Sequence, residues 1–220
     1  MTLDFINVGY GDAILIRSGS FTMLVDCGDW TVGDGGPDSQ RISAADFLRQ
    51  EGIDTLDLLV LTHLHRDHSG GLTKLLECVA VRSFRCNYLP DRIFWGKRVP
   101  VPEGFSAGAR CLLESLNVFL SALAIMERQG TEISLASPGT WPLTPELTAE
   151  CFLEAQPIFE RQATIWQKQT GRKVLASAEF KKFFEENEHW LLPYAALKIR
   201  FWFLEIKSAL QEGKKLRQDC

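Results

Sequence analysis

The stretch LDLLVLTHLHRDHSGGL, residues 56–72, joins an apolar run to a cluster of histidines. Its first part, LDLLVL, has the length and composition of a buried strand. Four side chains of the kinds that bind metal ions follow at once, namely His63, His65, Asp67 and His68. The whole chain has 4 histidines, so three of them within one short segment are hard to assign to chance. The alternative is a chance grouping on a polar loop.

The spacing of these residues suits a shared ion. In an extended segment the side chains at positions i and i+2 point the same way, so His63 and His65 can reach one ion together. Leu64 between them would then point back into the core. Asp67 and His68 come next, where the chain turns, and would face the same hollow from another side. Imidazole nitrogens and a carboxylate oxygen suit zinc and tolerate iron or manganese.

The first part of the chain alternates β-rich runs with helical patterns, which predicts an α/β fold. Gly9-Tyr10-Gly11-Asp12 reads as a turn, because no helix follows it that could receive a phosphate. Residues 27–37 form a long Gly/Asp loop of a kind that often carries function. We predict strands at 2–8, 13–17, 21–26, 56–61 and 81–89, and helices at 39–50 and 71–79.

The pattern changes after residue 90. A Pro/Gly-rich loop is expected first, then a long amphipathic helix and a short strand, and PGTWPLTP (138–145) reads as a break. Nearly everything beyond it reads as helix. We therefore predict a domain at 1–145 and a helical region at 146–220. Trp30, Phe94 and Trp95 could wall a substrate pocket or fill the core. The ranges are 90–105 for the loop, 131–137 for the strand, and 106–129, 146–169, 177–190 and 194–212 for the helices.

Bulk composition narrows the class of protein. The formal net charge of −4 shows no strong attraction to nucleic acid or to a membrane, although a local basic patch could still form. No apolar run approaches the roughly 20 residues of a membrane span. The N-terminus lacks a basic start followed by an apolar stretch, and the 6 cysteines form no C-x-x-C pair. A cytoplasmic, reducing location is expected.

Two stretches of the sequence resemble a known family. LDLLVLTHLHRDHSGGL is similar to the defining motif of the metallo-β-lactamase superfamily of metallo-hydrolases. DFINVGYGDAILIRSGSFTMLVDCGD resembles the opening strands of that fold. The similarity is greatest to the branch found in the hydrolase domain of bacterial DNA-uptake competence proteins. It covers about residues 2–77 and extends more weakly to about residue 150.

The resemblance implies an αββα sandwich, and it also implies a role for each of five residues in a metal site. His63 and His65 would bind a first metal ion, and Asp67 and His68 a second. Asp26, in LVDCGD, would support the site from behind by holding a ligand histidine in one tautomer. Without the resemblance, Asp26 would be read as a turn carboxylate that caps local N–H groups.

The sequence departs from the family downstream of the motif. A complete two-metal site adds a third histidine, a bridging aspartate and a final histidine, but only Asp91, His189 and Asp219 follow Gly71. Asp91 reads as a turn residue, and His189, three residues after Glu186, as a histidine on a helix surface. The N-terminal half of the fold is therefore expected to be present and the second half incomplete. FFEENEHWLLPYAALK instead resembles a helical segment of 4-α-glucanotransferases and carries no transferable catalytic residue.

These features predict a metal-dependent hydrolase. One or two zinc ions would activate water to attack an ester, amide or phosphodiester, and Asp67 could take a proton from that water. The substrate would be a small molecule or a phosphodiester, and the charge does not indicate nucleic acid. The alternative is an incomplete, inactive family member that acts as a binding or scaffold protein.

Overall fold

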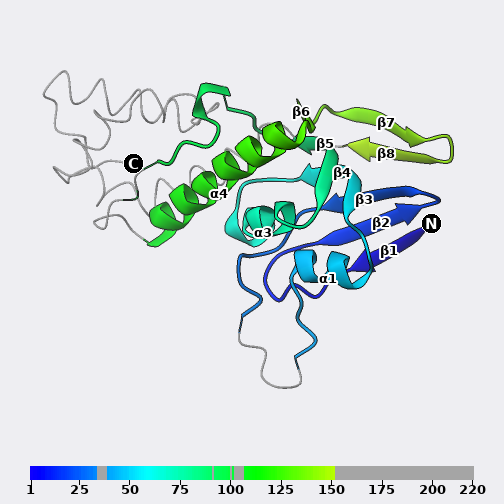
Figure 1. The fold of residues 1–220 in the computed structure, drawn as a ribbon, viewed down its shortest axis with the longest axis horizontal. Coiled ribbons are helices and arrows are strands. Elements are labelled where there is room, and N and C mark those ends of the chain that lie inside the picture. Colours follow the sequence, from blue (N-terminus) through cyan, green and yellow to red (C-terminus); the bar gives the residue numbers. More distant parts are fainter. Residues whose placement is uncertain (34–38, 91, 100, 102–106, 152–220) are drawn as a thin grey trace, which may run out of the picture. The chain divides into compact units, whose positions relative to one another are not determined.

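The computed structural model describes residues 1–33, 39–90, 92–99, 101 and 107–151 (Figure 1). The chain divides into two compact units. One comprises Met1–Arg98 with Cys111–Leu153, and the other Val99–Arg110 with Glu154–Cys220. The sheet and the histidine cluster both belong to the first unit, which is described below.

A six-stranded mixed sheet forms the centre of this unit, in the order β1-β2-β3-β4-β5-β6 (Figure 1). The first three strands are antiparallel neighbours, and β3 to β6 are parallel to one another. Gly19, with φ +58°, makes the tight turn between β2 and β3. The strands are β1 Thr2–Phe5, β2 Ile14–Ser18, β3 Phe21–Val25, β4 Thr55–Leu61, β5 Ala80–Cys86 and β6 Glu132–Leu135.

Three helices cover one face of the sheet. They are α1 (Ala44–Gln50), α3 (Leu72–Leu76) and α4 (Ala107–Gln129), and buried residues of all three join the core of the sheet. In the described residues, no helix is both long and apolar enough to cross a membrane.

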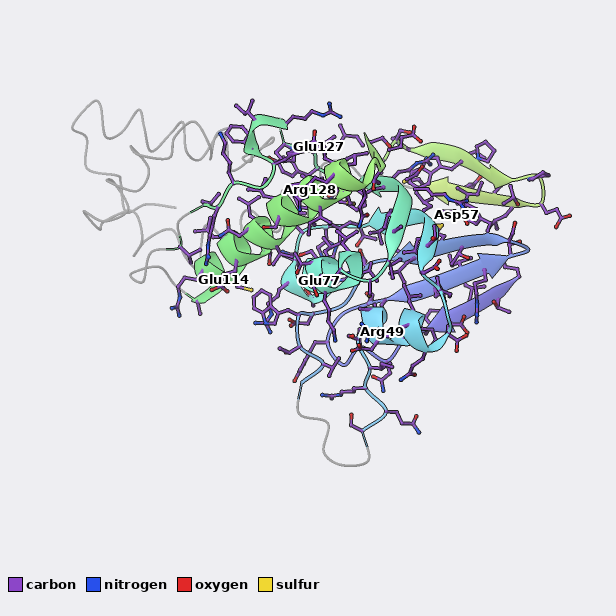
Figure 2. All side chains as sticks on the ribbon, viewed as in Figure 1. Arg49, Asp57, Glu77, Glu114, Glu127 and Arg128 are labelled. Atoms are coloured by element: carbon purple, nitrogen blue, oxygen red, sulfur yellow. The ribbon has the colours of Figure 1, made fainter. Side chains whose placement is uncertain are left out.

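Helix α4 is amphipathic, as its sequence pattern predicts. Phe119 and Met126 are fully buried, and the Phe119 ring lies 6.3 Å from that of Phe84 on β5. Glu114 and Glu127 of the same helix are exposed (Figure 2). The helix therefore closes the core with one stripe and faces solvent with the other.

A two-stranded hairpin covers part of the opposite face. It consists of β7 (Gly139–Thr144) and β8 (Leu147–Cys151). Trp141 on β7 is 8% exposed and packs with Met23, Leu58 and Val60 of the sheet. Its indole N–H donates to the carbonyl oxygen of Ser137 at 2.9 Å. The Arg85 guanidinium lies 4.4 Å above its ring.

The sequence prediction is wrong in this hairpin. Residues 138–145 are not simply a break, because β7 lies there, and Leu147–Cys151 forms a strand instead of the start of a helix. The reason is that burial alternates with a period of two residues, as in a strand. Leu147, Ala149 and Cys151 are half-buried, whereas Thr148 and Glu150 are exposed. Five residues are too few for this alternation to stand out against the longer helical pattern that follows.

Most other elements are confirmed within a few residues. The helix predicted from residue 39 begins only at Ala44, because Ser43 caps it by accepting a hydrogen bond from the Asp46 N–H. The α/β class is confirmed, and the sheet is mixed, whereas the αββα sandwich stays a prediction. The division at residue 145 stays a prediction, and the unit that holds the sheet continues to Leu153. The helices expected at 177–190 and 194–212 lie outside the described residues.

Replacing Trp141 by alanine should lower the free energy of unfolding by about 3–5 kcal/mol, since a large buried aromatic is lost. Phe5→Ala is the matched control: Phe5 is 76% exposed on the edge strand β1, and its loss should cost about 1 kcal/mol or less. Urea denaturation of both variants measures the difference. Equal costs would mean that the hairpin does not stabilise the sheet through Trp141.

Candidate metal centre

The cluster lies where two parallel strands end side by side. Val25 of β3 pairs with Val60 of β4, so the segments that follow these strands leave the sheet at the same edge. The Asp26 N–H donates to the Val60 carbonyl oxygen at 2.8 Å. This edge, beyond the carboxyl ends of parallel strands, is a usual place for sites in α/β proteins.

Asp26 is buried behind the histidines in an unusual backbone conformation. It is 2% exposed, and its φ of +58° makes it the one non-glycine residue with positive φ in the described part of the chain. Aspartate tolerates this left-handed conformation better than most residues, at some energetic cost. The conformation turns the chain away from the strand while the carboxylate stays beneath the loop that follows β4.

The Asp26 carboxylate gathers three hydrogen bonds from that loop. The Thr62 N–H donates to Oδ1 at 2.8 Å, and the Thr62 hydroxyl donates to Oδ2 at 2.6 Å. His68 Nδ1 lies 2.8 Å from Oδ2. Burial raises the pKa of this carboxyl, whereas the bonds from Thr62 and His68 act in the opposite direction. Asp26 therefore holds the start of the loop and one of its histidines together.

The three imidazoles lie in contact. The ring centroids of His63 and His65 are 4.7 Å apart in an edge-to-face arrangement, and those of His63 and His68 are 4.0 Å apart. Asp67 Oδ2 lies 3.7 Å from His68 Nε2. Leu64, between the first two histidines, packs against the core as its position in the sequence predicts. All four predicted metal-type residues are thus neighbours in space.

Local structure explains how a short segment brings them together. The extended backbone at His65 caps the short helix α2 (Arg66–Ser69), which turns the chain directly after the strand exit. This turn places His68 beneath His63. Gly71 then lets the backbone pass close by, because a side chain there would overlap the Cys27 carbonyl oxygen.

The surroundings of His63 and His65 favour the neutral form of both rings. Burial lowers the pKa of His63 to about 4, and the charges of His68 and His65 act in the same direction. Burial also lowers the pKa of His65. Neutral imidazole is the form that binds metal ions. For His68, an Nδ1–H that donates to Asp26 leaves the lone pair on Nε2, the nitrogen nearer Asp67.

The donor set fits a divalent cation chemically. Three imidazoles and one half-exposed carboxylate are ligands that zinc prefers. In the described ranges, however, no group of three or more His, Cys, Asp or Glu is arranged as a formed metal site. Asp91, His189 and Asp219 lie outside the described residues. The described residues therefore bring the candidate ligands close together, but these ligands do not surround one position at which an ion would sit.

The turn at Gly9–Asp12 contributes to the site, which sequence reasoning missed. A side chain at Gly11, where φ is +86°, would overlap the backbone carbonyl of Asp67. Asp12 Oδ2 lies 3.9 Å from His68 Nδ1, so it adds a negative charge near the cluster. The turn itself could be predicted from the two glycines. Its contact with Asp67 could not, because it depends on how the loops of separate strands pack.

Arg66 anchors the other side of the loop. Its Nε and Nη2 both donate to Asp29 Oδ2, at 2.8 and 2.7 Å, and its guanidinium lies 4.5 Å from the centre of the Trp30 ring. Trp30 is 38% exposed and lines a surface pocket with Thr31. Phe94 and Trp95, the other two loop aromatics, pack into or against the core.

One family model matches this part of the chain. Residues 6–103 match the family model "Metallo-beta-lactamase superfamily". The match includes Asp26, Thr62 and the whole histidine cluster. This part of the chain, 98 of its 220 residues, is therefore similar to the metallo-β-lactamase superfamily.

Solved structures are similar at low sequence identity. A subclass B3 metallo-β-lactamase, MEM-A1 from a soil metagenome library, is 17% identical with a TM-score of 0.35, covering 62% of this chain and 44% of its own. The metallo-β-lactamase SMB-1 is 16% identical with a TM-score of 0.38, covering 65% and 47%. An N-acyl homoserine lactone hydrolase is 16% identical with a TM-score of 0.32, covering 62% and 51%. The chain thus spans about half the length of these proteins, and no curated protein matches it.

Gly11→Ala should destabilise the protein more than Gly19→Ala. Both glycines have positive φ, where a side chain costs about 1–2 kcal/mol, but a Cβ at Gly19 meets no atom within 4 Å. The clash with Asp67 should add about 1–3 kcal/mol at Gly11 alone. Chemical denaturation in EDTA measures both costs, and NMR of the histidine rings should show a shift of His68 only in Gly11→Ala. Equal costs with unchanged His68 signals would contradict the contact.

Proposed function

We propose that this protein is a metal-dependent hydrolase that acts on an ester, amide or phosphodiester bond. The observation that carries this proposal is the gathering of three imidazoles and Asp67 at one strand exit, over a buried carboxylate. The similarity of residues 6–103 to the metallo-β-lactamase superfamily supports the reaction type. Fold membership alone does not choose a substrate, because one fold supports many chemistries.

The cluster would hold one or two zinc ions, with iron or manganese as substitutes. His63 and His65 would bind one ion, and Asp67 and His68 the other. When bound, such an ion makes hydroxide available near neutral pH and stabilises negative charge on the substrate.

The residues of this chain have separate tasks in the proposed reaction. Asp67 is half-exposed and can accept a proton from water at the site, so we assign it the catalytic role. Burial keeps His63 and His65 neutral and therefore ready to bind metal. Asp26 is too deeply buried to meet a substrate, and it orients His68.

The stretch DFINVGYGDAILIRSGSFTMLVDCGD suggests which branch of the superfamily this chain resembles most. We propose that the chain is related to the hydrolase domain of DNA-uptake competence proteins within the superfamily. The formal net charge of −4 favours a small molecule or an isolated phosphodiester over a long nucleic acid. Cytoplasmic action fits the scattered cysteines, five of which are free thiols in the described part.

One observation favours a second candidate function. A catalytic zinc ion takes about three protein ligands plus water, yet the motif is followed by one histidine only, His189. A site limited to residues 63–68 would hold metal weakly. The chain would then be an inactive family member that acts as a binding or scaffold protein.

A measurement of zinc binding distinguishes a working metal site from a chance grouping of histidines. Protein dialysed against EDTA and titrated calorimetrically with zinc should take up one or two equivalents. His63→Ala should weaken the binding by more than about 100-fold, because a direct ligand matters more than a supporting residue. His189→Ala, the same substitution at the one histidine outside the cluster, should leave it unchanged. An absence of zinc binding by the wild-type protein would refute the hydrolase.

Turnover then decides between an active and an inactive protein. With zinc or manganese added, we expect hydrolysis of bis(p-nitrophenyl) phosphate or of an acyl lactone, lost in Asp67→Asn. Asp54→Asn, which removes the same charge on the loop before β4, is the control and should retain activity. Stoichiometric zinc without turnover of either substrate would favour the scaffold protein.

A further inference from the structure

Thr62 stands between the buried carboxylate and the first histidine of the cluster. Its hydroxyl lies 2.6 Å from Asp26 Oδ2 and 3.0 Å from His63 Nδ1. Its backbone N–H is held separately by Asp26 Oδ1 at 2.8 Å. The residue is exposed, but two bonds to one buried carboxylate fix its position. The hydroxyl therefore bridges Asp26 and His63.

The direction of the hydrogen bonds in this bridge follows from the chemistry of each group. An ionised carboxylate can only accept hydrogen bonds, and the Thr62 N–H, the Thr62 hydroxyl and His68 Nδ1 all lie within hydrogen-bond distance of the Asp26 carboxylate. The Thr62 hydroxyl must then donate its one hydrogen to Asp26. Its oxygen is left as an acceptor towards His63, so the ring nitrogen in that contact carries the hydrogen. Nδ1 of His63 is a donor, and its lone pair lies on Nε2.

We propose that Thr62 is a positioning residue that sets the tautomer of His63 and so leaves Nε2 of this ring as the metal-binding nitrogen. This inference rests on the proposed function. One carboxylate then orients two rings of the cluster: His68 directly, and His63 through the hydroxyl of Thr62. The ring planes of these two histidines are tilted by 46°, and their centroids lie 4.0 Å apart. A common anchor at Nδ1 gives both rings the same exposed atom, Nε2, for an ion.

The bridge explains why the hydroxyl matters at this position. Asp26 Oδ2 accepts from His68 and from the Thr62 hydroxyl, and that hydroxyl connects the carboxylate to His63. A threonine at the end of β4 supplies that group at the point where the backbone leaves the sheet. A side chain without a hydroxyl would leave Nδ1 of His63 to solvent, and both tautomers would be populated.

The test compares Thr62→Val with Thr62→Ser. Valine has nearly the shape of threonine but no hydroxyl, whereas serine keeps the hydroxyl. Thr55→Val is the matched control, because the Thr55 hydroxyl also bonds to an aspartate, Asp54, at 3.0 Å but away from the cluster. In EDTA near pH 7.5, long-range ¹H–¹⁵N correlation spectra of histidine-labelled protein report the tautomer of each ring without any metal.

We expect His63 to carry its hydrogen on Nδ1 in the wild-type protein, in Thr62→Ser and in Thr55→Val. Thr62→Val should show a mixture of both tautomers. Zinc affinity, measured by calorimetry, should fall by about 10- to 100-fold in Thr62→Val, the usual effect of losing a group that orients a ligand histidine. Thr62→Ser should stay within about threefold of the wild-type affinity.

Three results would overturn the proposal. The first is a wild-type His63 with its hydrogen on Nε2, which needs no variant to fold. The second is a folded Thr62→Val with wild-type tautomer and affinity. The third is an equal loss of affinity in Thr62→Ser and Thr62→Val. Failure of the proposed function looks different: wild-type protein that binds no zinc would remove the metal-binding role, even if the spectra still showed Thr62 setting the tautomer.

Discussion

One buried carboxylate organises this site. Asp26 is the first residue after β3. Its carboxylate accepts hydrogen bonds from Thr62, the first residue after β4, and from His68, the last histidine of the cluster. A buried carboxylate without such donors would cost several kcal/mol in lost solvation. The donors come from the same short segment that carries the imidazoles. The need to satisfy Asp26 therefore also fixes the path of the histidine loop.

The parallel pairing of β3 and β4 makes this arrangement possible. Parallel neighbours end at the same edge, so residues 36 positions apart, Asp26 and Thr62, meet directly. Helices α1, α3 and α4 bury one face of the sheet and hold these strands in register. On the other face, the β7–β8 hairpin covers part of β3 and β4 through Trp141. The strands that carry the site are thus packed on both sides.

Much of this could be predicted from the sequence. The strand at 56–61 and the i, i+2 spacing of His63 and His65 are local features, and both are found in the structure. The proximity of Asp12 and the bridging position of Thr62 could not be predicted, since they depend on loops from different strands meeting. The β7–β8 hairpin was missed because its strands are short and a longer helical pattern follows. Resemblance to the family indicated a role for Asp26 that its local sequence alone would not suggest.

The central claim is that residues 63–68, oriented by Asp26, bind a divalent cation through imidazole and carboxylate groups. X-ray absorption at the zinc K-edge tests this claim most directly, because it reports the atoms around the ion and the characteristic scattering of imidazole rings. The account predicts a first shell of nitrogen and oxygen alone, at about 2.0–2.2 Å, with at least one imidazole per ion. A shell containing sulfur at about 2.3 Å, or one without imidazole scattering, would contradict it.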